Sequence, residues 1–275
     1  MIKLSYGLQM LDDMSLEEFE HCAQIASKIG YEGLEPSVCS PKTINKEAIK
    51  TILDRYHLKF SALRSGGLYD RQGARFSNPD PSERQRAMIL MKEMIDLCGY
   101  FDCDLNFGRV QGWIPDTESI EQGKAYIAEC VRECSEYCAQ YNIKFDFEPI
   151  NRYDMNYNNT TKETLAFVQH INENCSNPVM LLMDIFHSFL EDYEVGAAFV
   201  RSGALCGHVH FRDSNNGIPG TGIIDFKEVI CILQAMGYDG WIAMEIGANV
   251  CEFEYGASES YAYIKPILYK AYNCR

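Results

Sequence analysis

Short apolar runs alternate with longer amphipathic stretches along the whole chain. The short runs are rich in β-branched and aromatic residues, a composition that predicts buried strands. The longer stretches carry apolar residues at i, i+3 and i+4 spacing, as one face of a helix does. We expect strands over 3–9, 33–37, 59–64, 103–108, 144–150, 179–184, 205–211 and 241–246. We expect helices near 15–29, 43–56, 82–98, 118–141, 160–174, 189–202, 225–236 and 257–272.

Residues that begin and end helices stand at the expected boundaries. Ser15 precedes a helical pattern at the spacing of a capping box with Glu18. Thr160 or Thr161, and later Asp225, precede two further helical patterns. Glycines followed by tyrosine come after three helical patterns, as C-terminal capping glycines would, at 30–31, 99–100 and 237–238. These signals support the division of the chain into strands and helices.

The order of the elements predicts the fold class. Eight strand–helix units in about 250 residues match the size of an α/β fold of the (β/α)8 TIM-barrel type. No linker or low-complexity tract divides the chain, so we expect a single domain over residues 1–275. A doubly wound open sheet is the alternative, but no G-x-G-x-x-G follows the first strand to support it. The stretch 65–81 would be an enlarged loop on the catalytic face.

The composition narrows the class of protein. The chain has 47% hydrophobic and 23% charged residues, as soluble enzymes do. Its net charge of −14 argues against a partner with a phosphate backbone. No apolar run reaches the roughly 18 residues that cross a membrane. The 12 cysteines are scattered and the N-terminus lacks the features of a signal peptide. We therefore predict a cytoplasmic protein with reduced thiols that binds neither nucleic acid nor membranes.

Four potential metal ligands stand at the C-terminal ends of the last four predicted strands: Glu148, Asp184, His210 and Glu245. A barrel brings such side chains together at its catalytic end, and buried carboxylates are costly unless a partner neutralises them. Each alone would more often be a salt-bridged strand-end residue or a satisfied barrel histidine, as we expect for His208. Together they indicate a divalent cation. Mn²⁺, Mg²⁺ and Co²⁺ suit these ligands better than a structural zinc does, and Mn²⁺ is preferred.

Sequence motifs around these residues resemble a known family. They are E-P-x-N-R-[YF]-[DE], D-x-F-H, H-x-H-x-x-D-S-N-x-x-x-P-G-x-G and G-Y-D-G-x-x-x-x-E. Their combination resembles the sugar phosphate isomerase/epimerase superfamily, the xylose-isomerase-like TIM barrels, and within it the ketose 3-epimerases that act on D-tagatose, D-psicose or L-ribulose. The resemblance is strongest over 143–247. It implies a metal-dependent isomerase of carbohydrate metabolism that moves a proton at a carbon next to a carbonyl.

The resemblance also implies roles for single residues. The four residues above would hold the metal ion, and Glu148 and Glu245 would be the acid and base acting on opposite faces of the sugar. Asn216 stands where the epimerases have a substrate arginine, so Arg212 and Arg109 are candidates for that role. Asp154 replaces a family glutamate, and His187 matches a histidine that touches substrate. Apart from the resemblance, Trp113 in the loop after the fourth predicted strand could cover the apolar face of the sugar or pack within that loop. The substrate-binding candidates are thus Asp154, His187, Arg212, Asn216, Trp113 and Arg109.

Other functions stay open on the sequence alone. A dehydratase of cyclic polyols such as inosose and a hydroxypyruvate-type aldose–ketose isomerase share the fold and a similar residue set. An apurinic-site endonuclease and a non-catalytic barrel fit less well. The segment GIPGTG (217–222) could hold an anion or form a tight turn, and we favour a free ketose narrowly over a sugar phosphate. The resemblance also implies a dimer or tetramer.

Overall fold

The computed structural model describes residues 1–247 and 250–273, and all eight predicted strands are present. They form nine segments: β1 Lys3–Met10, β2 Gly33–Ser37, β3 Lys59–Phe60, β4 Ala62–Arg64, β5 Asp104–Phe107, β6 Phe145–Phe147, β7 Met180–Asp184, β8 Cys206–Phe211 and β9 Trp241–Met244. β3 and β4 are two halves of the predicted strand 59–64, and both pair with β2.

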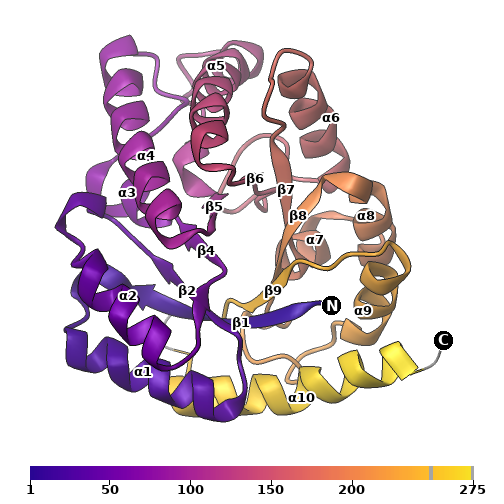
Figure 1. The fold of residues 1–275 in the computed structure, drawn as a ribbon. Coiled ribbons are helices and arrows are strands. Elements are labelled where there is room, and N and C mark those ends of the chain that lie inside the picture. Colours follow the sequence, from indigo (N-terminus) through magenta and orange to yellow (C-terminus); the bar gives the residue numbers. More distant parts are fainter. Residues whose placement is uncertain (248–249, 274–275) are drawn as a thin grey trace.

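The strands close into a parallel barrel with helices around it (Figure 1). The strand order is β1-β9-β8-β7-β6-β5-β4-β2-β3, and β1 also pairs with β2, which joins the two edges. Every pairing is parallel, as short strands linked by helices require. The predicted TIM barrel is therefore confirmed.

The helices lie on the outside of the barrel. They are α1 Leu16–Ile29, α2 Lys46–Arg55, α3 Gly66–Gln72, α4 Pro81–Phe101, α5 Ile120–Cys138, α6 Thr161–Asn172, α7 Ile185–Glu191, α8 Val195–Ser202, α9 Phe226–Ala235 and α10 Phe253–Asn273. Short 3-10 turns are η1 Leu11–Asp13, η2 Pro41–Thr43, η3 Arg109–Gln111, η4 Ala139–Tyr141 and η5 Gly203–Leu205. Ser15 and Thr160 cap α1 and α6 through full capping boxes, and Asp225 caps α9, as predicted.

Three expectations about the helices were wrong. The stretch 65–81 is not all loop, because it contains α3. The single helix expected over 189–202 is two helices, and the first begins directly after β7 because the Asp184 side chain accepts from the Phe186 and His187 N–H groups. Gly99 does not end its helix, since α4 continues to Phe101 and is capped by Asp102, which has a left-handed conformation with φ 54°.

The inside of the barrel is unusually polar for a protein core. Along β6, Phe145 and Phe147 pack with Phe107, and Phe147 also contacts Phe167 of α6, so these rings belong to the layer between strands and helices. Because side chains alternate along a strand, Asp146 between them points into the barrel. Other buried polar residues on the strands are Ser5, Glu35, Asn106, Asp184, His208 and His210. These groups must find partners inside the barrel.

Two further observations bear on the predictions from composition. Every cysteine among the described residues is a free thiol. None of the helices in the described part of the chain combines the length and the apolar character needed to cross a bilayer.

Candidate metal centre

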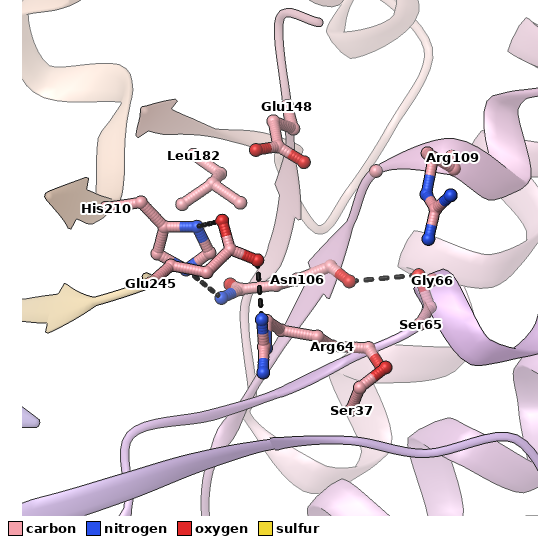
Figure 2. Close-up of a pocket in the computed structure, with 11 residues that line it drawn as sticks. Ser37, Arg64, Ser65, Gly66, Asn106, Arg109, Glu148, Leu182, His210 and Glu245 are labelled. Carbon is pink, nitrogen blue, oxygen red and sulfur yellow. Dashed lines mark hydrogen bonds and ion pairs between the residues drawn. The ribbon is translucent and has the colours of Figure 1, made fainter. Parts of the chain in front are cut away.

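Four side chains from four consecutive strands meet at the C-terminal end of the barrel. Glu148 follows β6, Asp184 ends β7, His210 lies in β8 and Glu245 follows β9. Each offers one ligand atom, and these atoms all lie within 4.8 Å of one another. Figure 2 shows Glu148, His210 and Glu245 around one pocket. The strand register explains the meeting, because Asp184 and His210 are direct partners across β7 and β8.

Backbone contacts beyond the strand ends hold the two glutamates in place. The Glu148 N–H donates to the Phe107 carbonyl at 3.0 Å, and the Glu245 N–H donates to the Phe211 carbonyl at 3.1 Å. Gly108 makes room for the first carboxylate, since a Cβ atom at this position would overlap Glu148 Oε2. The cage is therefore built on the rigid part of the barrel.

The two glutamates differ in their affinity for a proton. Burial, reinforced by the charge of Glu245, raises the pKa of Glu148 to about 8. Burial also acts to raise the pKa of Glu245, but His210, Arg212 and Arg64 outweigh it and hold that pKa well below its usual value. One carboxyl group of the pair therefore accepts a proton readily and the other stays ionised.

Behind the cage, Glu35 of β2 holds two histidines. Its Oε1 lies 2.6 Å from His210 Nε2, and its Oε2 lies 2.7 Å from His208 Nε2. Asn106 Nδ2 donates to Oε1 at 3.0 Å and Ser61 Oγ donates to Oε2 at 2.8 Å. Burial acts to raise the pKa of Glu35, but the two histidines overcome it and keep that pKa well below its usual value. Glu35 is thus a fully buried anion with every oxygen occupied.

This arrangement fits a divalent cation. An ionised carboxylate only accepts hydrogen bonds, so His210 Nε2 carries the proton that is donated to Glu35. The other ring nitrogen, Nδ1, is buried without a hydrogen-bond partner and lies 3.2 Å from Glu245 Oε2. Burial acts to lower the pKa of His210, but Glu35 and Glu245 outweigh it and raise that pKa well above its usual value. A divalent cation would therefore displace the Nδ1 proton, and the freed lone pair would join the three carboxylates. Carboxylate oxygens with one imidazole nitrogen suit Mn²⁺, Mg²⁺ or Co²⁺.

Glu35, His208 and His210 form a second group of close potential ligands. Two ligands of one ion at about 2.1 Å stand roughly 3.0–3.4 Å apart for usual coordination angles. The Glu35–histidine separations of 2.6 and 2.7 Å are shorter, and the first of them, to His210, is a hydrogen bond. We therefore assign this group to the support of His210 and not to a second ion.

Of the predicted substrate-binding residues, His187, Arg212 and Asn216 lie around the cage. His187 Nε2 is 3.6 Å from Glu148 Oε1 and 3.1 Å from Arg212 Nη2. Arg212 donates to Asp184 Oδ2 at 2.8 Å and to Asn216 Oδ1 at 3.2 Å. A histidine and an arginine therefore line the side of the cage formed by β7 and β8.

The other three predicted residues differ in how closely they approach the pocket. Asp154 is exposed and reaches the site only through Asn151, which donates to Asp154 Oδ2 at 3.0 Å and whose Nδ2 lies 2.8 Å from His187 Nδ1. Arg109 lines the pocket directly. Trp113 is 43% exposed and is not one of the residues that line the pocket.

Comparison with known proteins places the chain in a family. Residues 23–267 match the family model described as "Xylose isomerase-like TIM barrel". The chain belongs to this family. It is 28% identical over 229 residues to an L-ribulose 3-epimerase of Methylomonas sp. (strain DH-1), covering 80% of this chain and 75% of that protein. It is 28% identical over 186 residues to a D-psicose 3-epimerase of Ruminiclostridium cellulolyticum, covering 63% of this chain and 62% of the relative.

Solved structures of the xylose isomerase-like TIM barrels show the same fold. A D-allulose 3-epimerase from Methylomonas sp. superposes with a TM-score of 0.83 at 20% identity, over 97% of this chain and 98% of that one. A D-psicose 3-epimerase from Clostridium cellulolyticum H10 has a TM-score of 0.81 at 20% identity, over 97% and 99% of the two chains. The family predicted from the motifs is confirmed.

Two residues that line the pocket were not predicted from the sequence. Arg64 ends β4 and its Nη1 donates to Glu245 Oε1 at 2.5 Å. Asn106 in β5 lies 3.1 Å from His210 Nε2 through its Nδ2. Both stand near the C-terminal ends of predicted strands, which is the same sequence signal that identified the four ligands. Glu35 also carried a signal, because it is a charge inside the apolar segment GLEPS.

Proposed function

We propose that this chain is a divalent-metal-dependent sugar epimerase and that it acts as a ketose 3-epimerase. The observation that carries the proposal is the cage itself, in which two glutamates, an aspartate and a histidine place their ligand atoms within 4.8 Å. The relatives named above are L-ribulose and D-psicose 3-epimerases, enzymes of the isomerase class. The cage and the relatives support the same reaction.

An ion held by Glu148, Asp184, His210 and Glu245 would supply Lewis acidity that stabilises negative charge on a substrate oxygen when the neighbouring C–H proton leaves. The protein's own part is to move that proton. Glu148 and Glu245 come from β6 and β9, on either side of β7 and β8. A sugar between them presents one face to each carboxyl group. One glutamate removes the proton and the other delivers a proton to the opposite face, which inverts the carbon.

His187 and Arg212 would hold the sugar's hydroxyl groups in this process. His187 is buried against Glu148 and Asp184, and burial is the main cause that lowers the pKa of its imidazole. A neutral imidazole can direct one hydrogen bond to a hydroxyl without adding charge. Asp154 and Asn216 would act through Asn151 and Arg212, which they contact. Positioning of this kind accounts for a large share of enzymatic rate enhancement.

The test is deuterium incorporation from solvent into ketopentoses and ketohexoses by the Mn²⁺-loaded protein. We expect deuterium at C3 together with the C3 epimer. Glu148→Gln and Glu245→Gln should each abolish incorporation while the circular dichroism spectrum stays that of the wild type. Near-normal incorporation in either variant would refute the paired-acid mechanism. Appearance of a new ultraviolet chromophore without an epimer would indicate dehydration and refute the epimerase.

We also propose Mn²⁺ as the ion, one domain over residues 1–275, and a cytoplasmic homo-oligomer, a dimer or tetramer. These follow from the sequence and the family resemblance. Light scattering of the purified protein measures the assembly, and a mass well above the 31.4 kDa of one chain is the expected result.

A further inference from the structure

The pocket has a wall of different chemistry next to the metal cage. Ser37, Arg64, Ser65, Gly66 and Arg109 line it, from the ends of β2, β4 and β5 (Figure 2). Among all residues that line the pocket, Leu182 is the single aliphatic one with a large side chain. A sugar whose reacting carbons lie at the cage must extend its remaining carbons along this wall. The wall therefore determines which group the far end of the substrate carries.

Arg64 is held rigidly in this wall. Its guanidinium donates to the backbone carbonyls of Leu8 and Glu35 and to the Glu245 carboxylate. The side chain is 18% exposed, and its Nε is buried without a hydrogen-bond partner. Glu245 is also a candidate metal ligand, and a carboxylate shared with a divalent ion neutralises Arg64 less than it does alone. Arg64 Nε also lies 3.9 Å from Glu35 Oε1, so a second, buried carboxylate balances its charge. Arg64 is therefore committed to the protein's own acceptors.

Arg109 brings a second guanidinium to the same wall. It stands in η3, directly after β5, and pairs through one nitrogen with Asp70 of α3. The side chain is 45% exposed. The side chain also lines the pocket, so the donors of Arg109 that do not face Asp70 are available to a ligand there.

A neutral sugar offers hydroxyl groups, which do not neutralise a guanidinium. A phosphate or carboxylate does, and it binds arginine through paired, charge-assisted hydrogen bonds. We propose that Arg109 binds an anionic group, a phosphate or a carboxylate, at the end of the sugar remote from the reacting carbons. This inference rests on the proposed function, because it assigns the substrate class of the same site.

The other segment that could hold an anion is already occupied by the protein itself. Within 217–222, the Gly220 N–H donates to Asp213 Oδ2 at 2.8 Å. The same carboxylate accepts from Ser214 at 2.7 Å and from Ile224 at 3.2 Å. The loop after β8 is therefore a turn organised around an internal carboxylate. Of the two candidate anion sites, Arg109 in the pocket wall is therefore the one that is open to a substrate.

The experiment compares matched sugars on the Mn²⁺-loaded protein. The neutral members are D-ribulose and D-fructose, and the anionic members are D-ribulose 5-phosphate, D-fructose 6-phosphate and the keto-uronate with a C6 carboxylate. Deuterium exchange measures the reaction, and the thermal shift of each complex measures binding independently. We expect the anionic members to have the higher kcat/KM, with the larger of the phosphate and carboxylate effects identifying the group.

Arg109→Met should reduce the anionic-to-neutral ratio of kcat/KM by roughly ten- to a hundred-fold, the effect of losing a charge-assisted hydrogen bond. The matched control is Arg71→Met. Arg71 pairs with Asp13 with a side-chain exposure of 46%, close to that of Arg109, and does not line the pocket. The control should keep the wild-type ratio.

The outcomes separate this inference from the proposed function. Equal kcat/KM and equal thermal shifts for neutral and anionic sugars would overturn the anion site while exchange itself still supports the epimerase. A thermal shift specific for anionic sugars that Arg109→Met removes, without exchange of any sugar, would support the anion site and overturn the epimerase. Equal loss of the ratio in the Arg109 and Arg71 variants would overturn the role of Arg109.

Discussion

Replacement of Glu35 by glutamine tests how the barrel interior tunes the metal cage. Glutamine has nearly the same shape but no charge, and its amide can satisfy the four neighbours of Glu35. With its carbonyl toward His210 and Asn106, its NH₂ group can donate to His208 Nε2 and Ser61 Oγ, which both accept as well as donate. The fold and the His210 tautomer should therefore survive the substitution.

The negative charge behind His210 is what Glu35→Gln removes. The 2.6 Å contact between Glu35 and His210 Nε2 makes the imidazole a better electron donor at Nδ1. Loss of such outer partners costs typically ten- to a hundred-fold in metal affinity. Because the hydrogen bond itself is kept, we expect the lower end, about ten-fold or ~1.4 kcal/mol. Glu35→Leu also removes the hydrogen bond and should reduce affinity toward the upper end of that range.

Isothermal titration of Mn²⁺ into the metal-free protein measures this effect, with thermal denaturation in parallel to confirm folding. The control is Asp146→Asn, a second change from carboxyl to amide inside the barrel. Burial raises the pKa of Asp146 well above its usual value and favours its neutral form, so its replacement changes the charge of the barrel interior less than Glu35→Gln does. Mn²⁺ affinity should then fall less than in Glu35→Gln. Wild-type affinity in Glu35→Gln, or the same loss in both variants, would refute the role given to Glu35.

Three further predictions follow from single contacts. Gly108→Ala places a methyl group where Glu148 Oε2 lies, so Mn²⁺ affinity measured by titration should fall while the net charge is unchanged; wild-type affinity would contradict it. Mn²⁺ at a hundred times its Kd should stabilise the protein by about 2.7 kcal/mol, and EDTA should reverse the rise in Tm. A Tm that neither Mn²⁺ nor EDTA changes would contradict the metal site. Backbone N–H donors outweigh burial and lower the pKa of Asp213. The ionised carboxylate therefore stabilises the folded state fully above about pH 4, and this stabilisation is lost as the pH falls through the lowered pKa. Urea unfolding should show Asp213→Asn less stable than the wild type at neutral pH, with the gap closing in acid; a gap that is constant with pH would contradict this.

The pattern of apolar and polar residues was sufficient to predict the barrel. Each strand carries a local signal, and parallel strands joined by helices have few ways to assemble. The four ligands could be predicted for the same reason, because Glu148, Asp184, His210 and Glu245 each interrupt an apolar run at its C-terminal end. Closure of the barrel then brings them together without further information.

Contacts between distant residues could not be predicted in this way. Glu35 meets His210 across 175 positions of sequence, and Arg64 meets Glu245 across 181. Nothing near either residue identifies the partner. Gly99 shows the same limit on a smaller scale, since its local sequence resembles a helix end. The Tyr141 ring packs where a Cβ atom would be, so glycine is required there within the helix.

Diffraction from crystals soaked in MnCl₂, with data collected at a wavelength where manganese scatters anomalously, tests the central claim most directly. We expect one anomalous peak within about 2.0–2.3 Å of ligand atoms from Glu148, Asp184, His210 and Glu245. The histidine ligand should be Nδ1, with Nε2 still against Glu35. Four side chains turned away from one another, with no peak between them, would contradict the metal centre and the function built on it.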